Sequence, residues 1–260
     1  MLETRVRSDG GSAIIATACS CKRGATNSSC EIAANRAGAL VQHYPLFCNI
    51  SPRDCGEIVS AARKEVYSRR QTIYLEGDPV RQTVLLTSGC VKIVQVGQNG
   101  TEVILRLNGP GEALGMVGLN TQTRHCSTAQ VLTASTALVW DAAAFESLSM
   151  RFPALRRNTS HILYKRLEEL EERFREISTE KVAARLSHEI VRLLNQVGRR
   201  VNGAVQIKLS REELAQLIGT TLFTVSRLLS DWDEQGIVSA RRESVTVNNL
   251  QALIELSERE

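Results

Sequence analysis

The sequence has no apolar run long enough to cross a membrane, and it has few cysteines. No stretch of its 260 residues reaches the ~18 uninterrupted apolar residues that a membrane-spanning helix needs, so we expect no membrane association. The seven cysteines are odd in number and concentrate in the first third, which argues against a disulfide framework and for buried, redox-active or metal-binding thiols. The apolar run 13–18 is shorter than the core of a signal peptide, about 7 to 15 residues, and Lys22 follows it closely. We therefore expect a cytoplasmic protein.

A strong charge of one sign is also absent. Lys and Arg number 32 and Asp and Glu number 28, which gives a formal net charge of +4. This balance permits nucleic-acid binding without arguing for it, because binding depends on how positive charge is arranged along one face. Hydrophobic residues make up 43% and charged residues 23% of the chain, as in ordinary soluble globular proteins, and the length allows two medium domains.

The chain divides into four segments by its pattern. Residues 1–40 are rich in Ser, Gly, Ala and Thr without a sustained period, and we interpret them as a poorly ordered arm that carries three cysteines. Residues 41–150 contain short β-prone runs broken by turn residues, which predicts a small antiparallel sandwich or barrel. A long helix is expected over 151–178 and a second domain over 179–260.

The β-prone runs are spaced as in a compact barrel. They cover residues 71–75, 84–87, 90–96, 101–107, 129–133 and 137–140. Two of them flank Asn99-Gly100, a pair that supplies the positive φ values of a tight hairpin. Glycines also cluster around Pro110, and barrel corners explain this cluster more simply than a backbone cradle for an anion, although glycine alone does not separate the two.

The expected long helix, from Pro153 to Ser178, carries one narrow apolar stripe. Its apolar residues are spaced four, three, four and three apart, and charged residues fill the positions between them. The stripe consists of Leu163, Leu167, Leu170, Phe174 and Ile177. Two interpretations stay open: the stripe packs on the barrel of the same chain, or it packs on a second copy, for which two heptads alone are marginal. One helix could serve both.

A segment near the C-terminus has the pattern of a helix-turn-helix. Ser210 precedes a helix as its N-cap, and Glu213 completes a capping box. Gly219 allows the left-handed turn that separates this helix from a second one. Ala215 is small where the two helices must touch, and Val225 locks the second helix onto the first. Two β-prone runs, 237–242 and 243–247, then predict a wing.

The exposed early face of the second helix is the predicted reading surface. These side chains would enter a major groove with the N-terminus first: Thr221, Phe223, Thr224, Ser226 and Arg227. Arg227 can donate two hydrogen bonds to O6 and N7 of a guanine, worth ~1–3 kcal/mol of discrimination, and we favour this over a surface ion pair with Asp231. Other residues lie at helix starts, where hydroxyls, amides and a cation hold phosphates. They are Ser210, Arg211 and Thr221.

Over residues 44–255 the sequence resembles the CRP/FNR superfamily of bacterial transcription regulators. The resemblance rests on Leu46-Phe47, Leu75-Glu76-Gly77-Asp78, Ser88-Gly89-Cys90-Val91-Lys92, Gly109-Pro110-Gly111-Glu112, the long helix and Thr224-Val225-Ser226-Arg227-Leu228-Leu229. It implies an α+β chain with an N-terminal cyclic-nucleotide-binding-type β-roll (a double-stranded β-helix, or jelly roll), a dimerising helix and a C-terminal winged helix-turn-helix. It further implies that the protein is a regulator and not an enzyme. Such a regulator binds palindromic double-stranded DNA as a homodimer, has RNA polymerase as a partner, and responds to a small-molecule or redox signal.

Departures from the family pattern bear on that signal. Members that respond to cyclic AMP have a glutamate after the glycine that corresponds to Gly115, and an Arg-Ser pair further on. This sequence has Met116 and Cys126-Ser127 there, and Arg124 is a poor substitute for the arginine. A buried cyclic phosphate without a cation costs several kcal/mol, so cyclic AMP is not expected. The candidate effector pocket comprises Gly111, Glu112, Gly115, Met116, Arg124, Cys126 and Ser127.

An iron–sulfur cluster is the alternative cofactor. Oxygen-sensing members of the FNR branch bind one through N-terminal cysteines and one cysteine in the barrel, a position that corresponds to Trp140 here. The candidate thiols Cys19, Cys21 and Cys30 lie further upstream than in that branch, and Cys48 is the fourth candidate. Such centres need four soft ligands, but we favour free or redox-active thiols, and the effector stays unknown.

The recognition helix also departs from the family. Relatives usually carry a glutamate, which accepts from cytosine N4, where this chain has Phe223. Phe223 cannot accept a hydrogen bond and could instead pack on a thymine methyl group, while Arg227 should retain a guanine.

Two other functional classes are weaker. A metal-dependent β-roll enzyme needs histidines and a carboxylate that converge inside the roll, and of the four histidines only His125 lies within it. A sensor that acts through protein partners with a degenerate DNA domain is disfavoured by the intact turn chemistry at Ser210, Gly219 and Val225.

Overall fold

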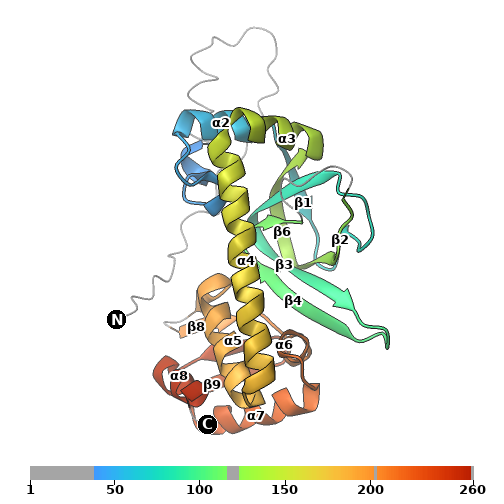
Figure 1. Cartoon of the computed structure of the whole chain (residues 1–260). Helices are drawn as coiled ribbons and strands as arrows, with labels where there is room; N and C mark the ends of the chain where they lie inside the picture. The colour runs from blue at the N-terminus through green and yellow to red at the C-terminus, as the bar shows by residue number, and fades with distance from the viewer. Residues whose placement is uncertain (1–37, 116–122, 202–203, 259–260) are drawn as a thin grey trace. The chain divides into compact units, whose positions relative to one another are not determined.

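The computed structural model describes residues 38–115, 123–201 and 204–258. These residues form two compact units (Figure 1). One unit contains 38–94 and 107–167, and the other contains 95–106 and 168–258. No helix in the described ranges is long and apolar enough to span a membrane.

The first unit is built on an antiparallel sheet. Its strands follow the order β1-β6-β3-β4, with β2 also paired to β6 and β5 to β3. The strands are β1 (Arg63–Tyr67), β2 (Thr72–Tyr74), β3 (Gln82–Val96), β4 (Glu102–Asn108), β5 (Ala113–Leu114) and β6 (Thr128–Asp141). The helices are η1 (Pro45–Phe47), α2 (Pro52–Ser60), α3 (Ala142–Arg151) and α4 (Pro153–Thr179), of which α4 continues into the second unit.

Two pairs of predicted short strands are in fact two long, bent strands. The runs 84–87 and 90–96 belong to β3, and 129–133 and 137–140 belong to β6. Their pairing shifts register between Leu86 and Val91, where Gly89 has a φ of +87°. A Cβ on Gly89 would lie 2.1 Å from Oγ of Ser135, so the bend needs glycine both for its conformation and for space. Strand β1 was not predicted, because Arg63–Tyr67 alternates charged and apolar residues too weakly.

The predicted hairpin at residues 97–100 is present with a different turn. The Gly97 amide donates to the Thr101 carbonyl at 2.9 Å, and the Gly100 amide donates to the Gly97 carbonyl at 2.9 Å. Only Gly100 has a positive φ, +80°, while the Asn99 side chain accepts from the Thr101 amide. The Asn-Gly pair therefore makes a longer loop rather than the two-residue turn that needs positive φ at both positions.

The core of this unit gathers around Trp140. The indole of Trp140 is fully buried, donates to the Ile58 carbonyl at 2.8 Å and meets the ring of Phe145 edge-on at 5.7 Å between centroids. Leu155 of α4 belongs to the same core, and the buried Asn158 amide donates to the carbonyls of Leu46 and Cys48. The start of α4 is thus fixed by apolar burial and by two hydrogen bonds.

The second unit combines helices with a small sheet of order β7-β8-β10-β9. Its remaining elements are α5 (Val182–Gln196), β7 (Arg199–Val201), β8 (Ala204–Ile207), α6 (Arg211–Ile218), α7 (Leu222–Glu234), β9 (Val238–Arg241), β10 (Ser244–Val247) and α8 (Leu250–Glu258). The predicted wing corresponds to β9 and β10, whereas β7, β8 and α8 were not predicted.

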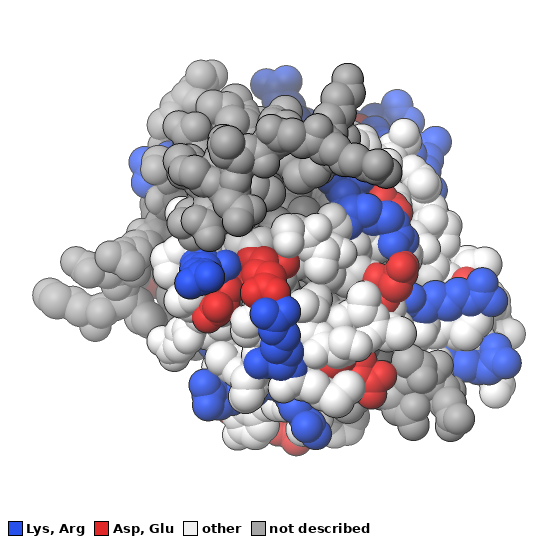
Figure 2. All heavy atoms as spheres, turned by 90° about the horizontal axis from the view of Figure 1, so that it is seen from above, with Lys and Arg blue, Asp and Glu red and all other residues white. Residues whose placement is uncertain are grey.

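The surface charge is mixed in the view of Figure 2. Among the described residues on that face, Lys and Arg side chains lie between Asp and Glu side chains rather than in one broad patch. This agrees with the small net charge of +4 and leaves DNA binding to be argued from local structure.

Candidate nucleic-acid interface

Helix α6 begins with the predicted capping box. The hydroxyl of Ser210 accepts from the Glu213 amide at 3.2 Å, and Oε2 of Glu213 accepts from the Ser210 amide at 2.7 Å. The Ser210 hydroxyl also donates to Oε2 of Glu213 at 2.8 Å. The cap is confirmed. Because the Ser210 hydroxyl both donates and accepts a hydrogen bond within it, Ser210 is less free to hold a phosphate than the sequence suggested.

The turn between α6 and α7 has the predicted chemistry. Gly219 is left-handed, with φ 67° and ψ 51°, and its amide donates to the Ala215 carbonyl. Nothing lies within 4 Å of the place of its missing Cβ, so glycine is needed there for conformation rather than for space. Thr221 then caps α7 by accepting from the Thr224 amide at 3.2 Å, at the helix start predicted from the sequence.

The inner face of α7 holds the helix against the rest of the unit. Val225, Leu229 and Trp232 are buried, and the buried Ala215 of α6 lies in the same unit. Leu228, next to Leu229 in the sequence, is only half-buried. Trp232 was missed by the sequence analysis, although it continues the spacing of Val225 and Leu229 by three residues.

The outer face of α7 presents the predicted reading residues. Phe223 is 78% exposed, Thr221 and Arg227 are exposed, and Thr224 and Ser226 are half-buried. The Arg227 side chain forms no hydrogen bond or ion pair with any described residue. The alternative pairing with Asp231 is therefore not formed, and the guanidinium is available to a ligand.

Arginines also lie at the start of α6 and on the small sheet. The Nε atom of Arg211 is buried and has no hydrogen-bond partner among the described residues. Arg241 and Arg242 are exposed at the turn between β9 and β10. The unpredicted strand β7 adds two more exposed arginines, Arg199 and Arg200.

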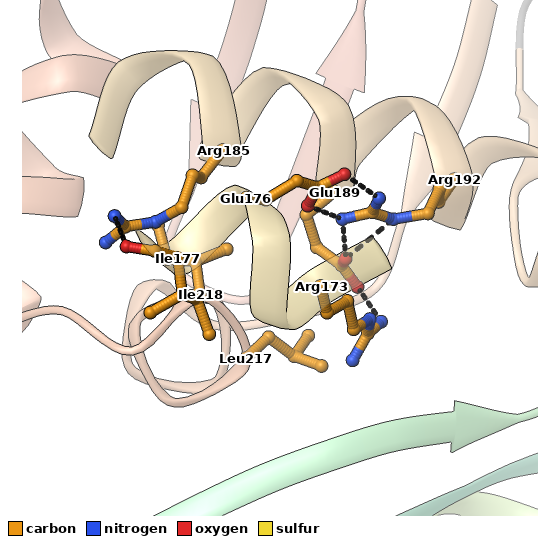
Figure 3. Close-up of a pocket in the computed structure, with 8 residues that line it drawn as sticks. All are labelled: Arg173, Glu176, Ile177, Arg185, Glu189, Arg192, Leu217 and Ile218. Carbon is orange, nitrogen blue, oxygen red and sulfur yellow. Dashed lines mark hydrogen bonds and ion pairs between the residues drawn. The ribbon is translucent and has the colours of Figure 1, made fainter. Parts of the chain in front are cut away.

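A buried cluster of charges supports the helix-turn-helix. Figure 3 shows Glu189 and Arg192 of α5 facing Arg173 and Glu176 of α4. Glu189 accepts from Arg173 at 2.8 Å and from Arg192 at 2.9 Å, while Arg192 donates to both oxygens of Glu176 at 2.6 and 2.8 Å. Burial of Arg192 disfavours its charge, but the hydrogen bonds that it donates to Glu176 and the nearby negative charge of Glu189 outweigh this and raise its pKa above the ordinary value. Leu217 and Ile218 of α6 line the same small cavity.

Sequence analysis missed this cluster because its members are spread over two helices. The only available signal was the density of Arg and Glu along residues 165–192, which is also typical of a solvated helix face.

The candidate effector residues that the structure describes lie in the first unit and differ in burial. Gly111 has a φ of +90° and packs on the ring of Tyr44, the half-buried Glu112 accepts through its carbonyl from the Leu86 amide, and Ser127 is buried. Arg124 and Cys126 are instead exposed, and Nη1 of Arg124 donates to the Gly77 carbonyl at 2.7 Å. Met116 lies outside the described residues.

His125 is a buried titratable residue that sequence analysis did not select. Its ring stacks on Tyr74 with 3.6 Å between centroids, next to Gly115, whose φ is +76°. Burial lowers the pKa of His125, and the nearby Asp78 carboxylate only partly opposes this. The imidazole is therefore kept neutral at pH 7.

Helix α4 also contacts the backbone beside this region. Nη1 of Arg166 donates to the Gly115 carbonyl at 3.3 Å, and its Nη2 donates to the Ala113 carbonyl. Arg166 was not predicted, because a surface arginine on a charged helix carries no signal of its partner in the sequence.

The cysteines differ in accessibility. Cys48 is exposed, Cys55 and Cys90 are buried, and the candidate ligands Cys19, Cys21 and Cys30 lie outside the described residues. Among the described residues no group of three or more His, Cys, Asp and Glu side chains could hold a metal ion. Burial raises the pKa of the Cys55 thiol to about 11, and Asp54 adds to this effect.

Most of the apolar stripe on α4 is exposed in the single chain. Leu167, Leu170, Phe174 and Ile177 are between 51% and 72% exposed, and Leu163 is half-buried. Leu163, the half-buried member of the stripe, lies in the same unit as the barrel.

Comparisons with known proteins agree with this arrangement. Residues 64–152 match the family model of the cyclic nucleotide-binding domain, and residues 181–256 match that of the Crp-like helix-turn-helix domain. The chain is 24% identical over 210 residues to the CRP-like cAMP-activated global transcriptional regulator of Mycobacterium tuberculosis, covering 80% of this chain and 94% of that one. It is 28% identical over 213 residues to the cyclic AMP receptor protein of Thermus thermophilus, covering 82% and 96%.

Solved structures agree in fold. FixK2 from Bradyrhizobium japonicum matches with a TM-score of 0.68 at 20% identity, over 76% of this chain and 98% of that one. The predicted architecture of β-roll, long helix and winged helix-turn-helix is thus confirmed. The chain matches both domain models in this order, and it matches 94% of the length of a relative described as a global transcriptional regulator. These findings lead to one conclusion: this chain belongs to the CRP/FNR superfamily of transcription regulators.

Proposed function

We propose that this regulator binds palindromic double-stranded DNA as a homodimer and reads each half-site with α7. The observation that carries the proposal is the outer face of α7, where the exposed Arg227 has no partner among the described residues and shares its face with exposed Phe223. A guanidinium that is free and lies near a helix N-terminus can donate two parallel hydrogen bonds to a guanine in the major groove.

Other residues have positioning roles in this proposal. Thr221 and Arg211, at the starts of α7 and α6, hold phosphates of the DNA backbone. Thr224 and Ser226 line the groove beside Arg227. The exposed Arg241 and Arg242 of the wing add phosphate contacts, which makes binding strongly dependent on salt.

The homodimer forms through the exposed stripe of α4. A second copy of the same stripe is an occupant of matching width and chemistry, and its apolar residues recur with the spacing of a two-helix seam. The dimer sets two α7 helices about 34 Å apart, one turn of DNA, so that both reach successive major grooves. RNA polymerase is the further partner that this function requires for the control of transcription.

The signal is a small molecule or a redox change, and it acts on the β-roll or on the N-terminal arm. The M. tuberculosis relative is described as cAMP-activated, but this chain has Cys126 where we expect the phosphate-binding arginine. The nearest substitute, Arg124, is exposed and donates to the Gly77 carbonyl. We propose that cyclic AMP is not the effector; a clear rise of the melting temperature with cyclic AMP would contradict this.

Selection of DNA fragments by the purified protein tests the DNA-binding proposal. We expect a palindrome with a guanine in each half-site, and Arg227→Ala should weaken binding to it by ~5- to 150-fold per half-site, the equivalent of ~1–3 kcal/mol. Arg53→Ala, which removes an exposed arginine at α2, is the matched control and should change nothing. Selection of the same sequences by the Arg227 variant would remove that residue from its role.

Sedimentation of the wild type and of Phe174→Glu tests the dimer. A charge at a position that is 72% exposed in the single chain should leave folding intact but separate the subunits and reduce affinity for the palindrome. Lys165→Glu changes an exposed charge on the same helix outside the stripe and should keep the dimer. A dimeric Phe174→Glu variant would place the interface elsewhere.

A further inference from the structure

Phe223 is an unusual side chain for the place that it occupies. It lies in the first turn of α7, is 78% exposed, and neighbours Leu222, which is 51% exposed. Thr221 caps the helix directly before them, so the backbone that carries Phe223 is well fixed. Two large apolar side chains thus lie side by side at the end of the helix that enters the groove first.

The helical period places Phe223 on the same face as Arg227. At 3.6 residues per turn, positions four apart differ by about 40° around the helix, and their Cβ atoms lie about 6 Å apart. Val225 and Leu229 of α7 are buried on the opposite side. Whatever base pair Arg227 contacts, the ring of Phe223 therefore reaches the same pair or one of the next two, since pairs are stacked about 3.4 Å apart.

The chemistry of the ring selects among the base edges. A phenyl group neither donates nor accepts an ordinary hydrogen bond, so covering the amino or carbonyl groups of a base would strip them of water without replacing it. In the major groove only thymine offers an apolar group, its C5-methyl. Cytosine at the same place presents a polar amino group and no methyl group.

We propose that Phe223 is a specificity-determining residue that packs on the 5-methyl group of a thymine within two base pairs of the guanine contacted by Arg227. This rests on the proposed function, because it requires α7 in the major groove.

Removal of the methyl group alone provides the test. In the palindrome selected by the wild type, each thymine near the guanine is replaced in turn by deoxyuridine, which pairs identically. At one position affinity should fall about fourfold per half-site, the value of one buried methyl group, or about fifteenfold when both half-sites are changed. In an operator with cytosine at that position, 5-methylcytosine should bind more tightly than cytosine.

Matched variants assign the effect to the ring. Phe223→Ala should bind the thymine and deoxyuridine operators equally, whereas Leu222→Ala, which removes the neighbouring exposed side chain, should keep the full methyl effect. Both positions are exposed, so the variants should keep the wild-type circular dichroism spectrum.

The outcomes separate this inference from the function on which it rests. Equal affinity of the wild type for all deoxyuridine operators, with the guanine preference of Arg227 intact, would overturn the role of Phe223 and leave the proposed function standing. An undiminished methyl effect in Phe223→Ala would overturn it as well. Binding without any base preference would overturn both.

Discussion

The substitution Glu189→Gln should destabilise the unit that contains the helix-turn-helix. The carboxylate of Glu189 is almost completely buried and accepts hydrogen bonds from Arg173 and Arg192. Glutamine keeps the shape but removes the charge, so two guanidinium groups remain near an uncharged amide. In the variant, the carboxylate of Glu176 still accepts two hydrogen bonds from Arg192.

The magnitude follows from the exposure of the groups left behind. Removing one partner of a fully buried ion pair costs about 3–5 kcal/mol. Here the side chains of Arg173 and Arg192 are 18% and 35% exposed, so water can solvate part of their charge in the variant. We therefore expect a loss of about 2–3 kcal/mol in the free energy of unfolding of this unit, below the full value for a buried pair.

Urea unfolding at pH 7, monitored through hydrogen exchange of peptides from α7, measures the free energy of unfolding of this unit by itself. The matched control is Glu172→Gln, which removes an exposed carboxylate from the pair with Arg175 and should leave the unfolding midpoint unchanged. If Glu189→Gln and Glu172→Gln had the same free energy of unfolding, solvent would stabilise the two guanidinium groups as well as Glu189 does. The buried cluster would then not be a source of stability.

Three further predictions concern the first unit. The pKa of His125 is lowered in the folded protein, so below about pH 6.5 the unfolded chain binds a proton more readily than the folded one. The free energy of unfolding of the unit should therefore fall as the pH is lowered from 7 to about 5. In urea titrations His125→Phe should flatten this pH dependence. Iodoacetamide should label Cys48 within minutes and spare Cys55 in the native protein, as mass spectrometry would reveal; equal rates would contradict the burial. Gly111→Ala should lower the melting temperature more than Gly77→Ala, because both have positive φ but only the former would place a Cβ against a tyrosine ring.

The helix-turn-helix could be predicted in detail because its signals are local. The cap at Ser210, the left-handed Gly219 and the buried Val225 each follow from the chemistry of one residue and its near neighbours. The same holds for the outer face of α7, since one buried position fixes the direction of all the others on a helix. The start of α7 is local as well, because the hydroxyl of Thr221 caps the helix by accepting from the Thr224 amide.

The first unit was predicted less well because its features depend on contacts between distant segments. Strands β3 and β6 read as four short runs, since the bend at Gly89 is set by its pairing with the segment around Ser135. The stack of His125 on Tyr74 joins residues that are far apart in the sequence, and neither has a neighbour that predicts the other. Periodicity shows which face of an element is buried but not what covers it.

Helix α4 shows how both kinds of information combine. The sequence identified its apolar stripe but left open whether the barrel or a second copy covers it. In the structure the charged positions make the contacts within each unit: Arg166 with the carbonyls of Ala113 and Gly115, and Arg173 with Glu189. The charged residues make contacts within the chain, while most of the apolar stripe stays exposed. Exposure of four large apolar side chains on one helix is unfavourable in water. The exposed stripe is therefore best explained by a second copy that covers it, which is the arrangement proposed above.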